Sequence, residues 1–365
     1  MSLDQKIGGV ILRPTDTRLT ASAWSKPLYG KTMVEWVNNA LDNKCGVVDY
    51  SQSQEIPVAV RNSINKNFAY TAVLYADTPL ITKKTVVEAV QMLEKLGLNA
   101  LKMTRGYIFN TQYLLTAERI FTAKTYFFDE EDFITALNSR QVALIGDIMR
   151  QRILHYHMDN GVIFDDPSTS YVDCDVKIGN NVTIEPNNIL RGKTIIKDGA
   201  ELCSGNVIVD SIIGEEALVN SSQIYKSTVG AKAIVGPYAY IRPDSRIGAK
   251  CRIGDFVEIK SATLGNGCKV SHMSYVGDAT LGKDCNVGSG VVFVNYDGKK
   301  KHKTIVGNNV FIGSNSNIIA PIKIEDNAFV AAGSTLTENV PKEALAIARA
   351  RQLNKADFNV GGKKY

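Results

Sequence analysis

The sequence has 365 residues, 44% hydrophobic and 22% charged, and its 42 basic and 37 acidic side chains give a formal net charge of +5. This composition is typical of a folded globular chain and excludes a disordered, collagen-like or disulfide-dense secreted protein. The length favours two or three domains. The mild positive charge does not by itself indicate nucleic acid, and no apolar run approaches the roughly 18 residues of a membrane span, so we expect neither nucleic acid nor membrane as a partner.

The start of the chain lacks a basic segment followed by a clean apolar stretch, so it does not read as a secretory signal. The six cysteines contain no CxxC pair. We therefore expect free thiols in a cytoplasmic protein.

The first 160 residues alternate two kinds of pattern. Residues 8–12 and 72–76 are short apolar runs typical of buried strands, whereas residues 32–43 and 83–100 carry apolar residues at helical spacing. Strands that alternate with helices predict an α/β domain with a parallel sheet over residues 1–160.

A six-residue period begins near residue 170. Aliphatic residues recur six positions apart, in one run at Ile178, Ile184, Leu190, Ile196, Leu202 and Ile208. A smaller residue follows four positions after many of the period residues, as Val182 follows Ile178. This pattern predicts a parallel β-solenoid of hexapeptide repeats over residues 170–340, with three hexads in each of about nine coils. Residues 341–365 are expected to form a C-terminal helix and tail, because PKEALAIARARQ (341–352) has a helical pattern.

Two features depart from the plain repeat. Cys251, Cys268 and Cys285 suggest a metal site at first, but each occupies the small inward position about one coil from the next. We therefore predict that they fill the core. The stretch VNYDGKKKHKTI, before Val306, is too polar for the wall and predicts a protruding loop rich in lysine.

The solenoid frame also groups polar residues. Arg242 and Lys260 follow aliphatic positions three hexads apart, so they should stand one above the other on an outer face, with Tyr275 in the next coil. Arginine and lysine are the usual phosphate ligands, which suggests a phosphorylated substrate. A solvated polar face is the alternative reading.

His272 and Asn286 flank a corner one coil apart, and Asn295 begins the lysine-rich loop. A histidine beside two cations suits a substrate that must lose a proton, because imidazole is the usual general base near neutral pH. Only two histidines lie in the solenoid, too few for a three-histidine zinc site.

The stretch from GPYAYIRPDSRIG through SHMSYVGDATLG to VNYDGKKKHKT closely resembles the acetyltransferase half of the bifunctional N-acetylglucosamine-1-phosphate uridyltransferase/glucosamine-1-phosphate acetyltransferase family. The likeness continues through VFIGSNSNIIAPIKI, AAGSTL and ALAIARARQ, and covers about residues 170–352. It implies a left-handed parallel β-helix that assembles as a homotrimer with active sites between subunits. It also implies acetyl-CoA as co-substrate, glucosamine 1-phosphate or a related amino-sugar phosphate as acceptor, and a place in the synthesis of UDP-N-acetylglucosamine, a peptidoglycan precursor.

By motif, His272 matches the family's general base. The positions that hold the sugar phosphate are matched by Arg242, Lys260, Tyr275, Asn286 and Lys301, and those that contact acetyl-CoA by Asn295, Tyr296, Ser314, Ala332 and Arg349. In the implied reaction the free amine attacks the thioester directly while His272 takes its proton. Backbone N–H groups or Asn295 would stabilise the oxyanion.

The first half resembles the same family as a truncated and degenerate nucleotidyltransferase-like copy. In the segments similar to the family, Asp77 and Asn138 match metal-binding positions. The opening glycine-rich loop, however, is replaced by ILRPTDTRLT (11–20), which removes the close approach of backbone N–H groups to nucleotide phosphates. We therefore expect no uridyltransferase activity and no need for Mg²⁺.

Three functions remain to be separated: an acetyl-CoA-dependent N-acetyltransferase, a non-catalytic trimeric scaffold or regulatory protein, and a bifunctional enzyme with residual uridyltransferase activity. The presence of His272 together with the cations and amides around it favours the first, because a scaffold has no need of them. The exact amino sugar and the role of the N-terminal domain stay open.

Overall fold

The computed structural model describes residues 3–14, 18–50 and 56–356. The chain divides into two compact units. The first runs to Tyr156 and includes Val172–Cys174, and the second comprises His157–Tyr171 and the chain from Asp175 onward. None of the helices in the described part of the chain is long and apolar enough to cross a membrane.

The first unit is built on one mixed sheet. Its strands lie in the order β2 (Cys45–Tyr50), β1 (Ile7–Pro14), β3 (Tyr70–Tyr75), β5 (Tyr107–Asn110) and β4 (Ala100–Lys102). Strand β1 pairs in parallel with β2 and β3, whereas β5 is antiparallel to both β3 and β4. The prediction of a parallel sheet therefore holds only for β1–β3. Only four residues separate β4 from β5, too few for the crossover that parallel strands need.

Helices form where the sequence has helical spacing. Helix α2 (Met33–Asn39) begins with a capping box between Thr32 and Glu35, and α4 (Lys83–Lys95) begins at the N-cap Thr82. The buried residues of α4 pack with those of β1 and β3 in one apolar cluster. The other helical elements are η1 (Leu3–Lys6), α1 (Ala21–Ser25), α3 (Ile56–Asn62), α5 (Thr111–Thr116), η2 (Glu130–Phe133), α6 (Ser139–Asp159) and η3 (Pro167–Thr169).

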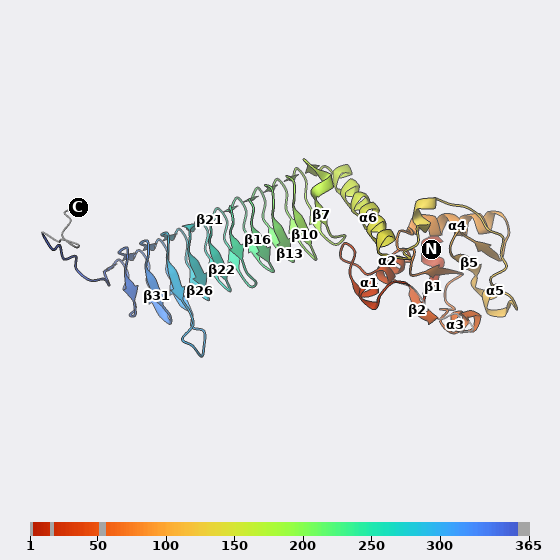
Figure 1. Cartoon of the computed structure of the whole chain (residues 1–365), viewed down its shortest axis with the longest axis horizontal. Helices are drawn as coiled ribbons and strands as arrows, with labels where there is room; N and C mark the ends of the chain where they lie inside the picture. The colour runs from red at the N-terminus through yellow and green to blue at the C-terminus, as the bar shows by residue number, and fades with distance from the viewer. Residues whose placement is uncertain (1–2, 15–17, 51–55, 357–365) are drawn as a thin grey trace, which may run out of the picture. The chain divides into compact units, whose positions relative to one another are not determined.

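The second unit is a parallel β-solenoid with three sheets, and Figure 1 shows its successive coils side by side from β10 to β31. The first solenoid sheet contains β10 (Ile189–Arg191), β13 (Val207–Val209), β16 (Gln223–Tyr225), β19 (Tyr240–Ile241), β22 (Glu258–Lys260), β25 (Tyr275–Gly277), β28 (Val292–Val294), β31 (Asn317–Ile319) and β34 (Thr335–Leu336). A further strand, β7 (Tyr171–Val172), has its first residue in the second unit and its second residue in the first unit.

The remaining coil strands form two more sheets. The second solenoid sheet contains β8 (Lys177–Ile178), β11 (Ile195–Ile196), β14 (Ile212–Ile213), β17 (Thr228–Val229), β20 (Arg246–Ile247), β23 (Thr263–Leu264), β26 (Ala279–Leu281), β29 (Thr304–Val306) and β32 (Ile322–Ile324). The third contains β6 (Ile163–Phe164), β9 (Thr183–Ile184), β12 (Glu201–Leu202), β15 (Leu218–Val219), β18 (Ile234–Val235), β21 (Arg252–Asp255), β24 (Lys269–His272), β27 (Asn286–Val287), β30 (Phe311–Ile312), β33 (Phe329–Val330) and β35 (Leu345–Ala346). The predicted hexapeptide solenoid is confirmed, while its left-handed sense stays a prediction.

The period residues fill the solenoid interior in register. One column of the first solenoid sheet is fully buried and consists of Ile208, Ile224, Ile241, Ile259 and Val276. The three predicted core cysteines are buried as well. Each of their thiols donates a hydrogen bond to a glycine carbonyl of the next coil at 3.0–3.1 Å, so they pack as small apolar side chains with a weak donor.

The prediction of a helix over residues 341–352 is wrong. This segment contains strand β35, which pairs in parallel with β33, and extended chain follows it. The N–H groups of Phe329 and Ala331 donate to the carbonyls of Ala344 and Ala346 at 2.8 and 2.9 Å. Alanine and leucine favour helix locally, but here the open edge of the last coil offers backbone partners, and this tertiary pairing overrides propensity.

Candidate active site

The two predicted cations lie side by side on the first solenoid sheet. Ile241 is in register with Ile259, and the N–H of Arg242 donates to the Ile259 carbonyl at 2.8 Å, so Arg242 and Lys260 occupy equivalent places in adjacent coils. Arg242 Nη1 lies 2.7 Å from Glu258 Oε1. This ion pair is partly exposed and holds the guanidinium against the sheet.

A third cation comes from the lysine-rich loop. The nearby ammonium group of Lys301 is the main cause that lowers the pKa of Lys260, with burial and the charge of Arg242 adding to it and Asp278 opposing it. Like charges disfavour each other's ionised form, so this lowering reports that positive charges crowd together. An anion bound between Lys260 and Lys301 would relieve the repulsion.

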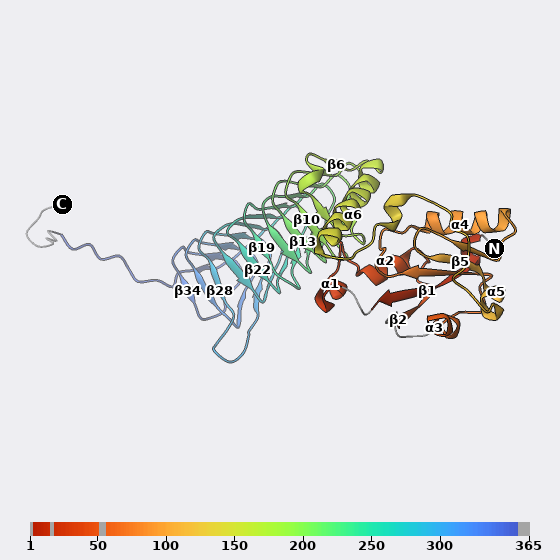
Figure 2. The same ribbon diagram turned by 45° about the vertical axis from the view of Figure 1, so that its right-hand side comes forward.

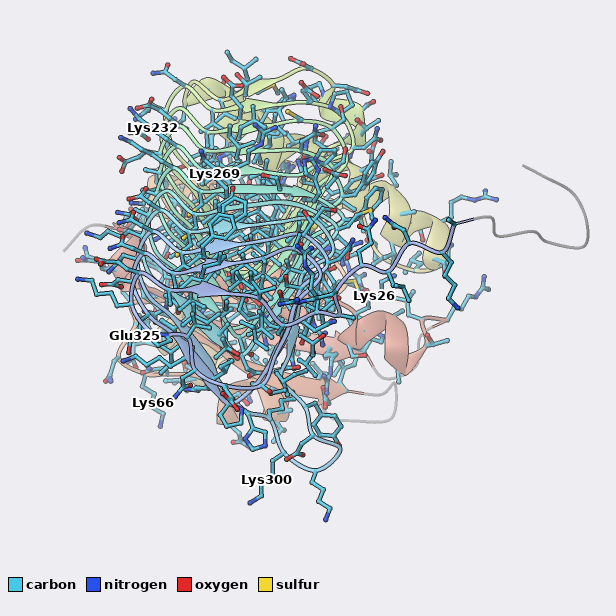
Figure 3. The ribbon with its side chains drawn as sticks, turned by 90° about the vertical axis from the view of Figure 1, so that its left-hand side faces the viewer. Lys26, Lys66, Lys232, Lys269, Lys300 and Glu325 are labelled. Carbon is cyan, nitrogen blue, oxygen red and sulfur yellow. The ribbon has the colours of Figure 1, made fainter. Side chains whose placement is uncertain are left out.

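The loop itself is an ordered hairpin. Tyr296 and Lys301 form an isolated bridge, and the N–H of His302 donates to the Asn295 carbonyl at 2.8 Å. Figure 2 shows the loop projecting from the coils between β28 and β29, and Figure 3 shows Lys300 at its outer end. The predicted protruding loop is thus confirmed.

Asp297 organises the tip of this hairpin. Its carboxylate accepts the N–H groups of Lys299 and Lys300 at 2.7 and 2.6 Å and lies 2.7 Å from Nε2 of His302. These donors, the Lys300 N–H first, hold the pKa of Asp297 well below its usual range. The loop lysines therefore project from a backbone that is already folded.

Asn295 anchors the base of the loop against the wall. The side chain is buried, and both N–H bonds of its Nδ2 are used, one to Asp278 Oδ2 and one to the Tyr275 hydroxyl at 3.2 Å. Because a carboxylate accepts and never donates, the amide orientation is defined, and its Oδ1 is the atom left for other partners. Asn295 is therefore not placed to donate to an oxyanion, contrary to one of the two expectations.

Gly277 makes room for this arrangement. It stands one coil above Lys260. A Cβ at this position would lie 2.3 Å from the Tyr275 hydroxyl and 2.7 Å from Asn295 Nδ2. A side chain here would displace both groups.

His272 lies on the third solenoid sheet, next to the corner that leads to Tyr275. Its ring Nδ1 is 2.6 Å from Oδ1 of Asp255, the residue in register with it one coil below. The imidazole is more than half exposed. Asn286 is in register with Lys269 and not with His272, so the corner pairing expected for it is only approximate.

A column of small residues continues from His272. Counting on from the registers of Lys269, Asn286, Phe311 and Phe329, the equivalent positions in the coils above are Ser289, Ser314 and Ala332. Arg349 reaches this column, because its Nη1 donates to the Ala332 carbonyl at 2.9 Å. Three of the expected acetyl-CoA positions, Ser314, Ala332 and Arg349, therefore lie in or beside this column. The column leads to His272 with a spacing of about 4.8 Å per coil.

Tyr296, the remaining expected acetyl-CoA position, lies in the hairpin. Its ring is exposed, and its hydroxyl donates to the Gly298 carbonyl at 2.7 Å. It therefore does not belong to the column.

Sequence reasoning missed three carboxylates. Asp255, Glu258 and Asp278 contact His272, Arg242 and Asn295 respectively. Each of the three lies one coil from its partner, so extending the columns to every polar position would have indicated them.

The expected remnants of a metal site in the first unit do not fit a metal ion. Both carboxylate oxygens of the buried Asp77 are bound by Arg105, at 2.9 and 2.5 Å, and the Arg105 guanidinium stacks on Tyr75. Asn138 Oδ1 accepts the N–H groups of Arg140 and Gln141 at the start of α6. Within the described ranges, no group of three or more His, Cys, Asp or Glu could hold a metal.

The segment that replaces the glycine-rich loop is described only in part. Arg13 forms a bidentate ion pair with Asp49, at 2.6 Å for both contacts. Residues 15–17 lie outside the described residues.

Comparison with known proteins identifies the solenoid. Residues 223–295 match the family model described as GMPPB C-terminal domain, and residues 303–338 match Bacterial transferase hexapeptide (six repeats). The Bifunctional protein GlmU of Clostridium acetobutylicum is 52% identical over 223 residues, which are 61% of this chain and 49% of that protein. Over these residues the chain is similar to part of the bifunctional GlmU proteins. That of Clostridium tetani is 54% identical over the same shares of the two chains.

The family resemblance inferred from the sequence is thereby confirmed. The chain spans about half the length of the curated relatives it matches. Among solved structures, LpxA from Acinetobacter baumannii is 19% identical with a TM-score of 0.24, over 50% of this chain and 70% of that chain. The interpretation of the first unit as a truncated uridyltransferase stays a prediction.

Proposed function

We propose that this chain is an acetyl-CoA-dependent N-acetyltransferase that acetylates the amine of glucosamine 1-phosphate or a related amino-sugar phosphate. The observation that carries the proposal is the crowding of Arg242, Lys260 and Lys301 beside a corner that holds the exposed imidazole of His272. Three cations suit a phosphate dianion, and an imidazole suits an amine that must lose a proton.

The sugar is held through its phosphate by the three cations, with the hydroxyl of Tyr275 and the amide of Asn286 as candidates for the sugar ring. Fixing the phosphate sets the position of the amine, which makes its attack effectively intramolecular. The amine nitrogen attacks the thioester carbonyl, and His272 accepts a proton from nitrogen. The C–S bond then breaks, and the CoA thiolate leaves and takes up a proton, so no acyl-enzyme is formed.

The column of Ser289, Ser314 and Ala332 supports the binding of acetyl-CoA along the solenoid. Its small side chains leave the backbone accessible, and Arg349 at its upper end supplies a cation for a CoA phosphate. Because both N–H bonds of Asn295 Nδ2 are already used, backbone N–H groups are the better candidates for the oxyanion.

An exposed apolar corner supports a homotrimer with sites between subunits. Tyr238, Phe256 and Met273 follow one another at this corner in consecutive coils, and each is about 60% exposed. Their φ angles are positive, between 41° and 58°, a conformation that costs large side chains about 1–2 kcal/mol each. Phe256 and Met273 directly follow Asp255 and His272, so a second copy covering this corner would also border the site.

For the first unit we propose no uridyltransferase activity. Arg105 occupies the carboxylate that a metal would need, and Asn138 caps a helix. Mixing the protein with UTP, Mg²⁺ and N-acetylglucosamine 1-phosphate should therefore release no pyrophosphate. Robust release would show that the first unit is a working nucleotidyltransferase.

Thiol release from acetyl-CoA in the presence of glucosamine 1-phosphate tests the main proposal. A panel that includes glucosamine 6-phosphate and unphosphorylated glucosamine defines the acceptor, and glucosamine 1-phosphate should react fastest. His272→Ala should abolish release, while the matched variant His155→Ala, which changes an exposed histidine of α6, should keep wild-type rates. No release by the wild-type trimer with any acceptor would favour the scaffold alternative.

A further inference from the structure

His272 has an acidic neighbour that neither its motif nor the family comparison assigns. Asp255 ends strand β21, directly below the position where His272 ends β24, and the two side chains meet at 2.6 Å between Oδ1 and Nδ1. The positions above His272 in the same column are Ser289, Ser314 and Ala332, none of which is charged. The column therefore brings its one carboxylate against its one imidazole.

The contact determines where the imidazole carries its proton. An ionised carboxylate is only an acceptor, so a hydrogen bond to it requires the proton on Nδ1. The lone pair of the neutral ring is then on Nε2. The bond with His272 is also the main cause that lowers the pKa of Asp255, so the carboxylate stays ionised through the neutral range.

We infer that Asp255 is a positioning residue for the transfer reaction, which holds His272 in the Nδ1–H tautomer and leaves Nε2 to take the proton from the substrate amine. This inference rests on the proposed function. The negative charge of Asp255 also stabilises the imidazolium that forms when the proton arrives. Asp255 itself neither contacts substrate nor exchanges a proton.

The other charged groups on the strands that carry Asp255 and His272 are not changed by the test. Strand β21 also carries Arg252, and β24 carries Lys269, which is in register with it. Both lie three residues before the pair. Strand β27, packed above, carries no titratable group. Substitution of Asp255 by asparagine therefore removes a charge only at this one contact.

The test is Asp255→Asn, with Asp284→Asn as a matched control. Asp284 is a corner carboxylate with a φ of 57°, a conformation that asparagine also accepts. In Asp255→Asn the side-chain amide can donate to Nδ1, which favours the proton on Nε2 and removes the lone pair that accepts from the substrate amine. Plateau kcat should fall about tenfold or more, and both KM values should stay within about threefold. The control should match the wild type.

A second measurement does not depend on turnover. Nitrogen-15 NMR of the His272 ring distinguishes a protonated from an unprotonated ring nitrogen, so it reports the tautomer directly. The wild type should carry the proton on Nδ1, and Asp255→Asn should lose this preference. Asp255→Ser serves as a second variant, because the same column already accepts serine at two positions.

The outcomes separate the two proposals. If the wild type does not carry the proton on Nδ1, or if folded Asp255→Asn keeps the wild-type tautomer, the role of Asp255 is refuted, even if kcat falls. If the wild type transfers no acetyl group, the proposed function fails, and the NMR experiment still decides whether Asp255 controls the imidazole.

Discussion

Replacing Lys260 by glutamine tests the anion site, because the side chain keeps its approximate length and loses its charge. A hydrogen bond from a charged group contributes about 1.5–3 kcal/mol. The loss should lie near the lower limit, because the substitution also removes the repulsion between Lys260 and Lys301 that the lowered pKa of Lys260 reports. At 1.4 kcal/mol per factor of ten, KM for the sugar phosphate should rise about tenfold.

Initial rates of thiol release at varied glucosamine 1-phosphate measure this effect. The KM for acetyl-CoA should stay unchanged, since Lys260 lies on a different sheet from the column assigned to acetyl-CoA. Lys250→Gln is the matched control, because Lys250 lies in the turn between β20 and β21, away from the cation cluster. A KM for sugar phosphate within twofold of the wild type, or an equal rise in Lys250→Gln, would refute the phosphate role of Lys260.

The interaction between Lys260 and Lys301 also predicts how the affinity for the sugar phosphate changes with pH. The ordinary lysine pKa is 10.5, and in the free protein Lys301 lowers that of Lys260. Affinity for the sugar phosphate should therefore begin to fall at a lower pH than an isolated lysine would give. Lys301→Gln should move this fall to higher pH, although it weakens binding at neutral pH. A fall that stays in place would mean that the two ammonium groups do not interact.

Three further predictions follow from other parts of the solenoid. Asp297→Ala removes the acceptor that orders the loop tip, so trypsin should cleave the loop faster than in the wild type, and equal rates would contradict that role. Phe293→Ala empties a fully buried site and should lower the free energy of unfolding by about 3–5 kcal/mol in denaturant titrations, whereas a loss below about 1 kcal/mol would mean the coil repacks. A hydrogen bond with the thiol one coil below raises the pKa of Cys268 to about 11, so Ellman's reagent should leave it unmodified until the protein unfolds, and rapid labelling of the native protein would contradict its burial.

The six-residue period predicted the site residues that lie on the regular coils. Arg242 and Lys260 are eighteen residues apart, which is one coil of three hexads, so the period places them in adjacent coils. The core cysteines follow from the same frame with each coil shortened by one residue. The family motifs added residues that the period alone did not single out, such as Lys301 and Arg349.

Contacts that depend on side-chain reach were not predictable. The sequence shows Lys301 somewhere in a polar loop, but only the folded hairpin brings its ammonium group to Lys260. Asp77 looked like a metal-binding remnant, and only the packing of the first sheet places Arg105 against it. The three carboxylates stand at coil positions that the period could have indicated, but only the folded structure shows which side chain each one contacts.

The amino-acid sequence by itself determined the coil, because a six-residue period places one aliphatic residue of each hexad in the solenoid interior. Each coil is therefore built from the same local pattern. Only the tertiary structure decided which strands close the ends and which polar atoms meet. Residues 341–352 show the limit, because their helical propensity yields to the backbone groups of β33, which the last coil would otherwise leave unpaired. Local preferences are a few tenths of a kcal/mol per residue, whereas a completed strand pairing satisfies several backbone groups at once.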